Sequence, residues 1–331
     1  MISKNMHLAD DLFKDDIKQV PTRDGYGNGL LELGGEDRNV VVLSADLTDS
    51  TRSKYFGDKY PDRFIEIGVA EQNLVTVASG LAAVGKIPFV ASYAAFCPGR
   101  CWEQIRTTIC YNDQNVKIAG AHAGISVGPD GATHQALEDI ALMRVLPNMM
   151  VIVPCDANEA KKATIAVGKI KKPAYLRLTR DKTPVFTTKK TPFELGKAEI
   201  YKDGEDVAII ACGPLVYQAL LAAEELTKEK IEATVINCHT IKPLDGKTIM
   251  NVAKKTGAVV TVEEHQVTGG LGGAITEYLS ENYPVPLKRV GIQDRYGESG
   301  TPNELLKTFG LTRIDIMDSV KSVLRLRDEK K

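Results

Sequence analysis

Short apolar runs alternate with longer amphipathic segments along the whole chain. These runs predict buried strands at 40–47, 86–93, 116–122, 149–156, 173–180, 206–213, 232–239 and 257–265. The runs are continuous, which is typical of parallel strands covered on both faces by helices. Amphipathic stretches such as EQNLVTVASGLAAVG separate them. The pattern predicts an α/β protein with doubly wound, mostly parallel sheets and ligands at the carboxyl ends of strands.

A change in composition divides the chain. Residues 181–199, DKTPVFTTKKTPFELGKAE, contain two Thr-Pro pairs and a Lys-Lys pair but no sustained apolar pattern. This is the composition of a linker. We therefore expect two domains, at 1–185 and 195–331, each long enough to bury a core.

Charge and composition narrow the class of protein. The 42 basic and 43 acidic side chains give a net charge of −1, which offers no general attraction to nucleic acid or anionic membrane. No apolar run reaches the roughly 18 residues of a spanning helix, and the polar, acidic start does not resemble a signal peptide. The six cysteines are scattered and do not form a disulfide framework. We expect a reduced, cytoplasmic protein.

Glu71 follows a loop and opens a predicted helix within EIGVAEQNLVTVASGLAAVG. A carboxylate in the first turn of a helix can simply complement the helix dipole. Its neighbours Ile67, Val69, Ala70 and Leu74 are apolar, however, and apolar surroundings favour the uncharged carboxyl. Glu71 is therefore a candidate general acid that could share a proton with a ring nitrogen.

Two further segments carry candidate site residues. Tyr93 and Phe96 lie on a predicted strand-to-helix loop, where core packing or a flat apolar slot would explain them equally. Cys97 and Cys101 lack the two-residue spacing of a zinc or redox motif, so we treat them as structural.

The segment GAHAGISVGPDGATHQALEDIALMR, at 120–144, is rich in glycine and concentrates three polar groups: His122, Asp130 and His134. Glycines allow such a loop to approach a ligand closely. Loop capping would explain the aspartate but not both histidines.

These residues carry a resemblance to a known family. Residues 23–180 resemble the pyrimidine-binding domain of transketolases, and residues 195–331 resemble their C-terminal domain. The most specific pieces are SADLTDS, IGVAEQ, and the run GPDGATHQALEDIALMRVLPNMMVIVPCDANE with the two histidines around its start. The resemblance covers nearly the whole chain.

The resemblance implies thiamine diphosphate as cofactor. Glu71 matches the glutamate that hydrogen-bonds N1′ of the aminopyrimidine ring. That contact favours the imino tautomer, whose 4′ nitrogen removes the C2 proton of the thiazolium. Tyr93 and Phe96 match the rings lining the aminopyrimidine pocket, and Asp46 matches an acidic residue near the cofactor at the subunit junction.

The resemblance also implies a substrate site. His134 matches a histidine beside the reacting carbonyl, where it donates to the developing alkoxide. Asp130 matches the aspartate that reads the hydroxyl next to the acceptor aldehyde. Four residues match the family's binding site for the terminal phosphate of the sugar: Arg23, Ser50, His122 and Arg180. They offer two guanidiniums, a hydroxyl and an imidazole. The planar fork of arginine suits such a dianion.

The half of a transketolase that binds the diphosphate is missing. Complete chains carry a Gly-Asp-Gly motif and a later asparagine that hold Mg²⁺ and the cofactor diphosphate; the sequences PDG, LDG and KDG occur here in other contexts. We expect a separate N-terminal subunit to hold the metal, in a symmetric α2β2 heterotetramer. The implied reaction moves a two-carbon ketol unit from a ketose phosphate to an aldose phosphate, as in pentose phosphate metabolism.

Three alternatives remain open. The first is the beta subunit of a 2-oxo acid dehydrogenase decarboxylase component, against which the phosphate-binding set argues. The second is a deoxyxylulose-phosphate-synthase-like enzyme, and the third a non-catalytic regulatory subunit on the same scaffold.

The sequence departs from the family at two places. Gln72-Asn73 follow Glu71, where many transketolases have histidine or phenylalanine. The segment CPGRC after Phe96 can be aligned with the family in two ways that differ by one position, so Arg100 is left outside the site. His239 and His265 receive no catalytic role.

Overall fold

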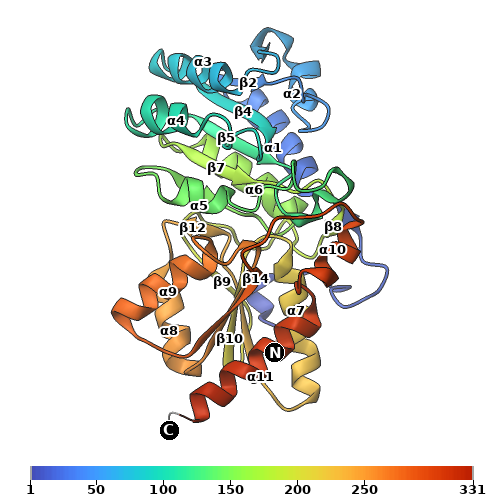
Figure 1. The fold of residues 1–331 in the computed structure, drawn as a ribbon. Helices are drawn as coiled ribbons and strands as arrows, with labels where there is room; N and C mark the ends of the chain where they lie inside the picture. The colour runs from blue at the N-terminus through green and yellow to red at the C-terminus, as the bar shows by residue number, and fades with distance from the viewer. Residues whose placement is uncertain (1, 330–331) are drawn as a thin grey trace.

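Two parallel-rich sheets are stacked end to end along the molecule (Figure 1). This computed structural model describes residues 2–329, so the first residue of the first expected domain and the last two of the second lie outside the described residues. The predicted α/β class is confirmed. Each of the eight apolar runs contains one strand of the structure.

The upper sheet in Figure 1 has seven strands in the order β12-β6-β7-β5-β4-β2-β3. Its strands are β2 (Val40–Ser44), β3 (Phe64–Glu66), β4 (Ile87–Tyr93), β5 (Lys117–Ala121), β6 (Met150–Ile152), β7 (Ala174–Arg177) and β12 (Thr240–Lys242). All pair in parallel except β12, which is antiparallel to β6. The helical segments of this half are α1 (Thr22–Glu36), α2 (Lys54–Lys59), η2 (Pro61–Arg63), α3 (Glu71–Ala83), α4 (Trp102–Gln104), η3 (Ile105–Cys110), η4 (Ile125–Asp130), α5 (Asp139–Arg144) and α6 (Ala157–Gly168).

The lower sheet has five strands in the order β14-β13-β10-β11-β9, with β9 antiparallel. Its strands are β9 (Glu199–Lys202), β10 (Val207–Ala211), β11 (Ala233–Asn237), β13 (Val259–Gln266) and β14 (Leu287–Ile292). Its helices are α7 (Leu215–Lys228), α8 (Gly246–Thr256), α9 (Leu271–Asn282), α10 (Pro302–Thr308) and α11 (Arg313–Asp328). The short elements η1 (Lys4–Met6), β1 (Gln19–Val20) and β8 (Thr183–Pro184) complete the fold, with β1 antiparallel to β8.

Two segments cross the division expected between 185 and 195. Strand β12 lies beyond that division in sequence but forms the edge of the upper sheet. In return, Leu12 and Ile17, near the N-terminus, are buried in the core of the lower half. The hydroxyl of Tyr217 fixes this segment by donating to Leu12 O at 3.0 Å.

A buried ion pair of the upper half lies where the two halves meet. Arg177, at the end of β7, donates through Nε to Asp139 Oδ2 at 2.8 Å, and both side chains are almost fully buried. Its Nη2 also donates to Glu264 O in β13 at 2.9 Å. The pair therefore sits where the two sheets meet, and a buried pair that loses one partner leaves an uncompensated charge.

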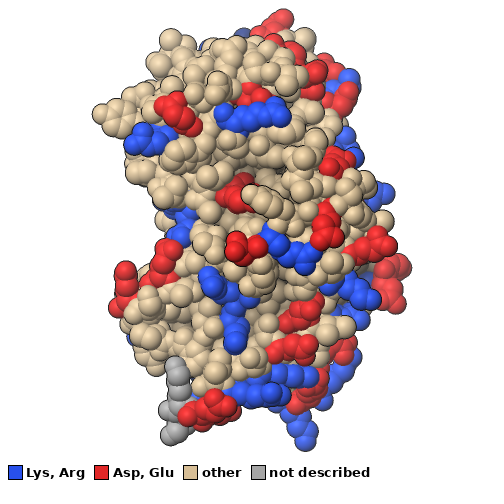
Figure 2. Space-filling model, viewed as in Figure 1, with Lys and Arg blue, Asp and Glu red and all other residues tan. Residues whose placement is uncertain are grey.

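The surface shows no dominant charge. On the face in Figure 2, basic and acidic side chains are interspersed, in line with the net charge of −1. Among the described residues, none of the helices has both the length and the apolar character needed to cross a membrane.

Candidate functional site

Four neighbouring parallel strands, β2, β4, β5 and β7, bring the candidate residues to one edge of the upper sheet. Ser50 follows β2, Tyr93 ends β4, His122 follows β5 and Arg180 follows β7. The carboxyl ends of parallel strands are where ligands bind in open α/β sheets. Residues spread over more than 100 positions in sequence are thereby placed side by side.

Glu71 is the first residue of α3 and is only 5% exposed. The preceding loop turns at Gly68, whose φ of +79° favours glycine. Arg100 Nη1 approaches the carboxylate, at 3.4 Å from Oε1 and 3.5 Å from Oε2. A buried carboxyl group at a helix start is thus paired with an arginine that the sequence analysis had left out.

Tyr93 and Phe96 form a pair of parallel rings beside Glu71. Their centroids lie 5.8 Å apart with an interplanar angle of 8°. The guanidinium of Arg100 lies over Phe96 at 3.9 Å from its centroid, so Arg100 contacts both the carboxylate and the ring. The predicted carboxylate and aromatic groups therefore belong to one cluster.

Both histidines of the glycine-rich segment reach this ring pair. The His122 ring meets Tyr93 edge-on at 4.0 Å, and the His134 ring meets Phe96 at 5.3 Å. His122 has a φ of +54°, the left-handed region that non-glycine residues rarely adopt. Such strain persists where the surroundings hold it and is common at functional sites.

His122 is held by an arginine. Arg23 Nη1 donates to His122 Nε2 at 2.7 Å and to Ser50 O at 2.8 Å. Burial, and then the charges of Arg23, Arg180 and Arg52, lower the pKa of His122 to about 2. The ring is therefore neutral, accepts at Nε2 and carries its proton on Nδ1.

Two donors of this cluster lack a partner. Among the described residues, Arg23 Nε and His122 Nδ1 are buried without a hydrogen bond. Buried donors without acceptors are costly, so both point to a ligand that accepts hydrogen bonds. An anionic group fits this requirement.

Arg180 and Asp130 form the next part of the site. Arg180 Nη1 donates to Asp130 Oδ2 at 2.7 Å. Gly128 and Gly131, with φ of +81° and +73°, provide the turns that place Asp130. A cavity of about 380 Å³ lies beside Arg180. Its charged lining consists of four basic and two acidic side chains: Arg23, Arg52, Arg180, Lys182, Asp24 and Asp181.

Arg52 is a residue that the sequence reasoning missed. Its Nε donates to Asp24 Oδ1 at 2.6 Å, and it faces the same cavity as Arg23 and Arg180. A signal was present, because Arg52 follows Ser50 by two residues at the end of SADLTDSTR. Asp24 and Asp181 offset two of the four basic groups, so the pocket keeps an excess of two positive charges.

Asp46 is the one candidate that lies apart. It is exposed, has a φ of +57°, and donates its backbone N–H to Glu66 Oε1 at 2.7 Å. Within residues 2–329 no hydrogen bond or ion pair joins its carboxylate to the ring pair. Its role near a cofactor stays a prediction.

The cysteines near the ring pair are buried thiols. A hydrogen bond with Cys101 and burial raise the pKa of Cys97 well above its usual range, which makes it a poor nucleophile or metal ligand. In the C-terminal half, His265 is buried with Nδ1 bonded to Gln266 O.

The four Asp-Gly pairs of the chain do not assemble a diphosphate site among the described residues. Asp24 accepts from Arg52 Nε at 2.6 Å. Asp130 pairs with Arg180, Asp245 caps α8, and Asp203 contacts Lys255 Nζ at 2.8 Å. The described residues thus supply the carboxyl group of Glu71, the ring pair and the anion pocket. The aspartates of the Asp-Gly pairs bind other groups of the protein and are not gathered into a site for a diphosphate.

Two family domains match successive parts of the chain. The chain matches the pyrimidine-binding domain of transketolase over residues 18–185 and the transketolase C-terminal domain over 196–316. It is 46% identical over 292 residues to a putative transketolase C-terminal section of Methanocaldococcus jannaschii, covering 87% of this chain and 92% of the relative. It is 43% identical to a 6-deoxy-6-sulfo-D-fructose transketolase subunit of Clostridium sp. (strain MSTE9), covering 94% and 97%.

Two solved transketolase structures resemble this chain. A split gene transketolase described as an inactive beta4 tetramer is 47% identical, with a TM-score of 0.88 over 93% of this chain and 99% of that one. Transketolase of Campylobacter jejuni, at 22% identity and a TM-score of 0.77, shares the fold over 94% of this chain and 50% of its own.

Proposed function

Because this chain belongs to the transketolase family, we propose that it is the C-terminal subunit of a split transketolase. The proposed activity is that of a transferase, moving a two-carbon ketol unit from a ketose phosphate to an aldose phosphate. The observation that carries the proposal is the buried carboxyl of Glu71 beside the ring pair, next to an anion pocket.

Transketolases depend on thiamine diphosphate, and the residues present fit its aminopyrimidine half. When bound, the cofactor would supply an acidic carbon whose deprotonated form is the nucleophile for the donor ketone. Glu71 would share a proton with the far nitrogen of the pyrimidine, since its carboxyl is buried at the slot. Tyr93 and Phe96 would wall the ring and exclude water.

His134 and Asp130 would handle the substrate. His134 lies against Phe96. It would donate to the carbonyl oxygen of the substrate as negative charge develops there. Asp130, held by Arg180, would accept from the hydroxyl next to the acceptor aldehyde. Both carboxylate and imidazole are kept in place by neighbours rather than by the substrate.

The anion pocket would bind the terminal phosphate of the sugar. The unpartnered donors on Arg23 and His122 support this assignment, as does the ring of basic groups. Ser50 contributes its hydroxyl, which lies 3.4 Å from Tyr93 Oη. Charge-assisted hydrogen bonds from several donors suit a phosphate dianion.

We propose an N-terminal partner subunit that holds the diphosphate and a divalent cation such as Mg²⁺, in an α2β2 assembly within the cytoplasm. A relative 47% identical to this chain is described as an inactive beta4 tetramer, which supports a requirement for a second chain. Val69, two residues before Glu71, is 70% exposed, as expected of a surface that a partner covers.

The alternatives differ in substrate. A 2-oxo acid dehydrogenase subunit would bind an unphosphorylated acid, and the arginine-lined pocket opposes that assignment. A 1-deoxy-D-xylulose-5-phosphate synthase of Syntrophus aciditrophicus is 36% identical over 305 residues, so pyruvate should be tested as donor. A purely regulatory subunit would need none of the unpartnered donors.

The test is reconstitution. The chain is purified alone and mixed with a candidate N-terminal subunit, and two-carbon transfer between sugar phosphates is measured with thiamine diphosphate and Mg²⁺. Activity is expected only in the mixture, with ketose phosphate and not pyruvate as donor. Full turnover by the isolated chain would refute the split arrangement, and absence of transfer with every donor would favour the regulatory alternative.

A further inference from the structure

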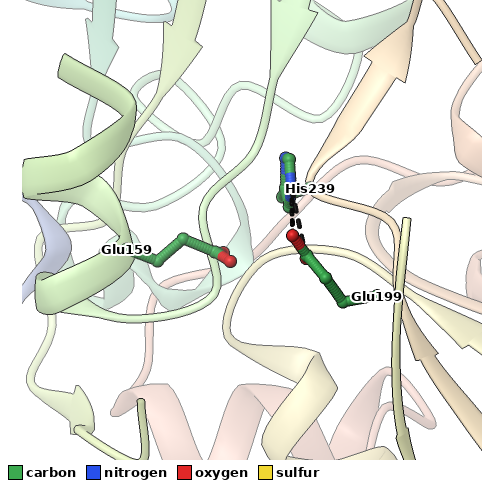
Figure 3. A group of neighbouring side chains, drawn as sticks. All are labelled: Glu159, Glu199 and His239. Carbon is green, nitrogen blue, oxygen red and sulfur yellow. Dashed lines mark hydrogen bonds and ion pairs between the residues drawn. The ribbon is translucent and has the colours of Figure 1, made fainter. Parts of the chain in front are cut away.

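Three buried ligand-forming side chains meet where the two halves join (Figure 3). Glu159 comes from α6 in the upper half, and Glu199 in β9 and His239 after β11 come from the lower half. Their exposures are 2%, 8% and 0%. One ligand atom from each lies within 4.8 Å of the others, far from the site of Glu71 in sequence and in the fold.

The two carboxylates lack a cationic partner. Within the described part of the chain, no lysine or arginine forms an ion pair with Glu159 or Glu199. Lys162 acts on them through space, but its Nζ donates to the carbonyls of Thr188 and Thr191. Burial raises the pKa of both carboxyls, that of Glu199 to about 8. The three side chains thus gather buried ligand atoms with no lysine or arginine paired with them in the described part of the chain.

The surrounding hydrogen bonds orient each group inward. His239 Nδ1 lies 2.9 Å from Thr240 Oγ1 and its ring stacks on Phe193, which leaves Nε2 facing Glu199. Glu159 accepts from Cys155 N at 2.6 Å and from Asn237 Nδ2 at 2.7 Å. Metal-binding histidines and carboxylates are commonly held by such second contacts.

Two buried oxygens in the cluster are left without a hydrogen bond. Glu199 Oε1 forms a hydrogen bond with His239 Nε2 at 3.2 Å. Glu199 Oε2, 3.1 Å from the same nitrogen, and Asn237 Oδ1 have no hydrogen bond in the described structure. A hydrogen-bonded protein interior rarely leaves acceptors in this state. The open carboxylate oxygen, next to an imidazole nitrogen, points to a ligand that accepts lone pairs.

We propose that Glu159, Glu199 and His239 bind a divalent first-row transition metal, with Zn²⁺ as the best fit, and that the ion fastens the two halves. One imidazole and two carboxylates favour such an ion over Ca²⁺ or Mg²⁺, which prefer oxygen ligands alone. Bonds of about 2.0–2.2 Å place ligand atoms roughly 3.5 Å apart. Glu199 and His239 already meet this, so Glu159 alone has to approach.

The site is separate from the proposed cofactor metal, which would belong to the partner subunit. Metal content of the isolated chain therefore tests it independently of transketolase activity.

The experiment uses the full-length chain without a tag. The wild type is incubated with excess Zn²⁺ at pH 8, desalted, and analysed by mass spectrometry for metal per chain. About one ion per chain is expected, with less than a tenth of that in Glu199→Gln and His239→Gln. The control variant His7→Gln, at an exposed histidine, should retain the ion. Zn²⁺ should also raise the Tm of the wild type by several degrees and leave the two site variants unchanged.

Two results overturn the proposal: a wild type that retains no Zn²⁺, or site variants that retain as much as the wild type. Should both variants fail to fold, anomalous diffraction at the zinc edge from soaked wild-type crystals decides the question. A peak between the three side chains is expected. Its absence would mean that the cluster holds only protons.

Discussion

Arg100 Nη1 lies 3.4 Å from Glu71 Oε1, and this is the closest charged contact of the buried carboxylate. The same guanidinium covers the ring of Phe96. The carboxylate and ring that a pyrimidine would need are thus both engaged by one arginine, whose side chain is half exposed. A bound pyrimidine would replace at least one of these contacts.

Replacing Glu71 tests the proposed proton relay. Glu71→Gln keeps the shape of the side chain but cannot share a proton, so kcat of the reconstituted pair should fall about 10²–10⁴-fold. Steady-state kinetics with sugar phosphates measures the loss. The exposed neighbour Asn73→Ala is the control and should remain active. A Glu71→Gln enzyme of near-normal kcat would end the assignment.

Replacing Arg100 tests whether it positions Glu71. Arg100→Ala leaves the buried carboxylate without its partner, and kcat/KM should fall roughly tenfold, in the range of one hydrogen bond to a charged group. Arg100→Lys keeps the charge but not the ring contact and should recover part of the activity. Wild-type kinetics in both variants would show that the contact matters only in the isolated chain.

The arginines of the anion pocket should set substrate affinity. Arg23→Ala or Arg180→Ala removes charge-assisted hydrogen bonds, so KM for phosphorylated sugars should rise roughly 10–100-fold. The kcat/KM for unphosphorylated analogues should hardly change. Arg38→Ala, at an exposed position outside the pocket, serves as the control. Equal losses with both substrate types would contradict a phosphate site.

His265 should make the fold sensitive to acid. Burial lowers its pKa to about 4, and its Nε2 accepts from Ala141 N of the other half at 3.3 Å. Below the usual histidine pKa of about 6.5, His265 is protonated in the unfolded chain but stays neutral in the folded chain. Its contribution to the free energy of unfolding is therefore complete above that pH and is lost as the pH falls toward 4. The loss is at most about 1.4 kcal/mol per pH unit.

Urea unfolding at pH 7, 6 and 5 measures this dependence. His265→Gln, which does not titrate, should lose less stability than the wild type over that range. Parallel curves for the two proteins would show that His265 does not contribute.

The buried pair between Arg177 and Asp139 should be essential for stability. Arg177→Met leaves Asp139 charged and buried, which should lower the free energy of unfolding by about 3–5 kcal/mol. The exposed pair of Lys161 with Glu32 offers a comparison, and Lys161→Ala should cost less than about 1 kcal/mol. Chemical denaturation measures the free energy of unfolding of both variants. Similar losses in the two variants would contradict the prediction.

The strands that the sequence predicted are those with buried faces on both sides. Strands β2 and β5 are buried at every position, so hydrophobicity alone marks them. Strand β3 is partly exposed, and β14 begins with exposed Lys288 and Arg289, so neither forms an apolar run. The short strand β12 pairs with a distant partner, and such pairing leaves no local signal.

Local sequence motifs predicted only part of the site. Glu71, Tyr93, Phe96 and both histidines lie in contiguous motifs that resemble the family, and the structure brings them together. Arg100 and Arg52 join the cluster because their long side chains extend from loops to the site. The spacing of residues along the chain does not predict such contacts. Asp46 would need a second chain beside it, which a single sequence cannot supply.

The exchange of β12 and of the N-terminal segment between the halves bears on where such a gene could be divided. A break at 185–195 would strip β6 of its edge neighbour and remove Leu12 and Ile17 from the lower core. Both fragments would then carry open edges or unfilled cavities, which invite aggregation. The two halves should therefore fold as one unit, and separating them between residues 185 and 195 should give unstable fragments.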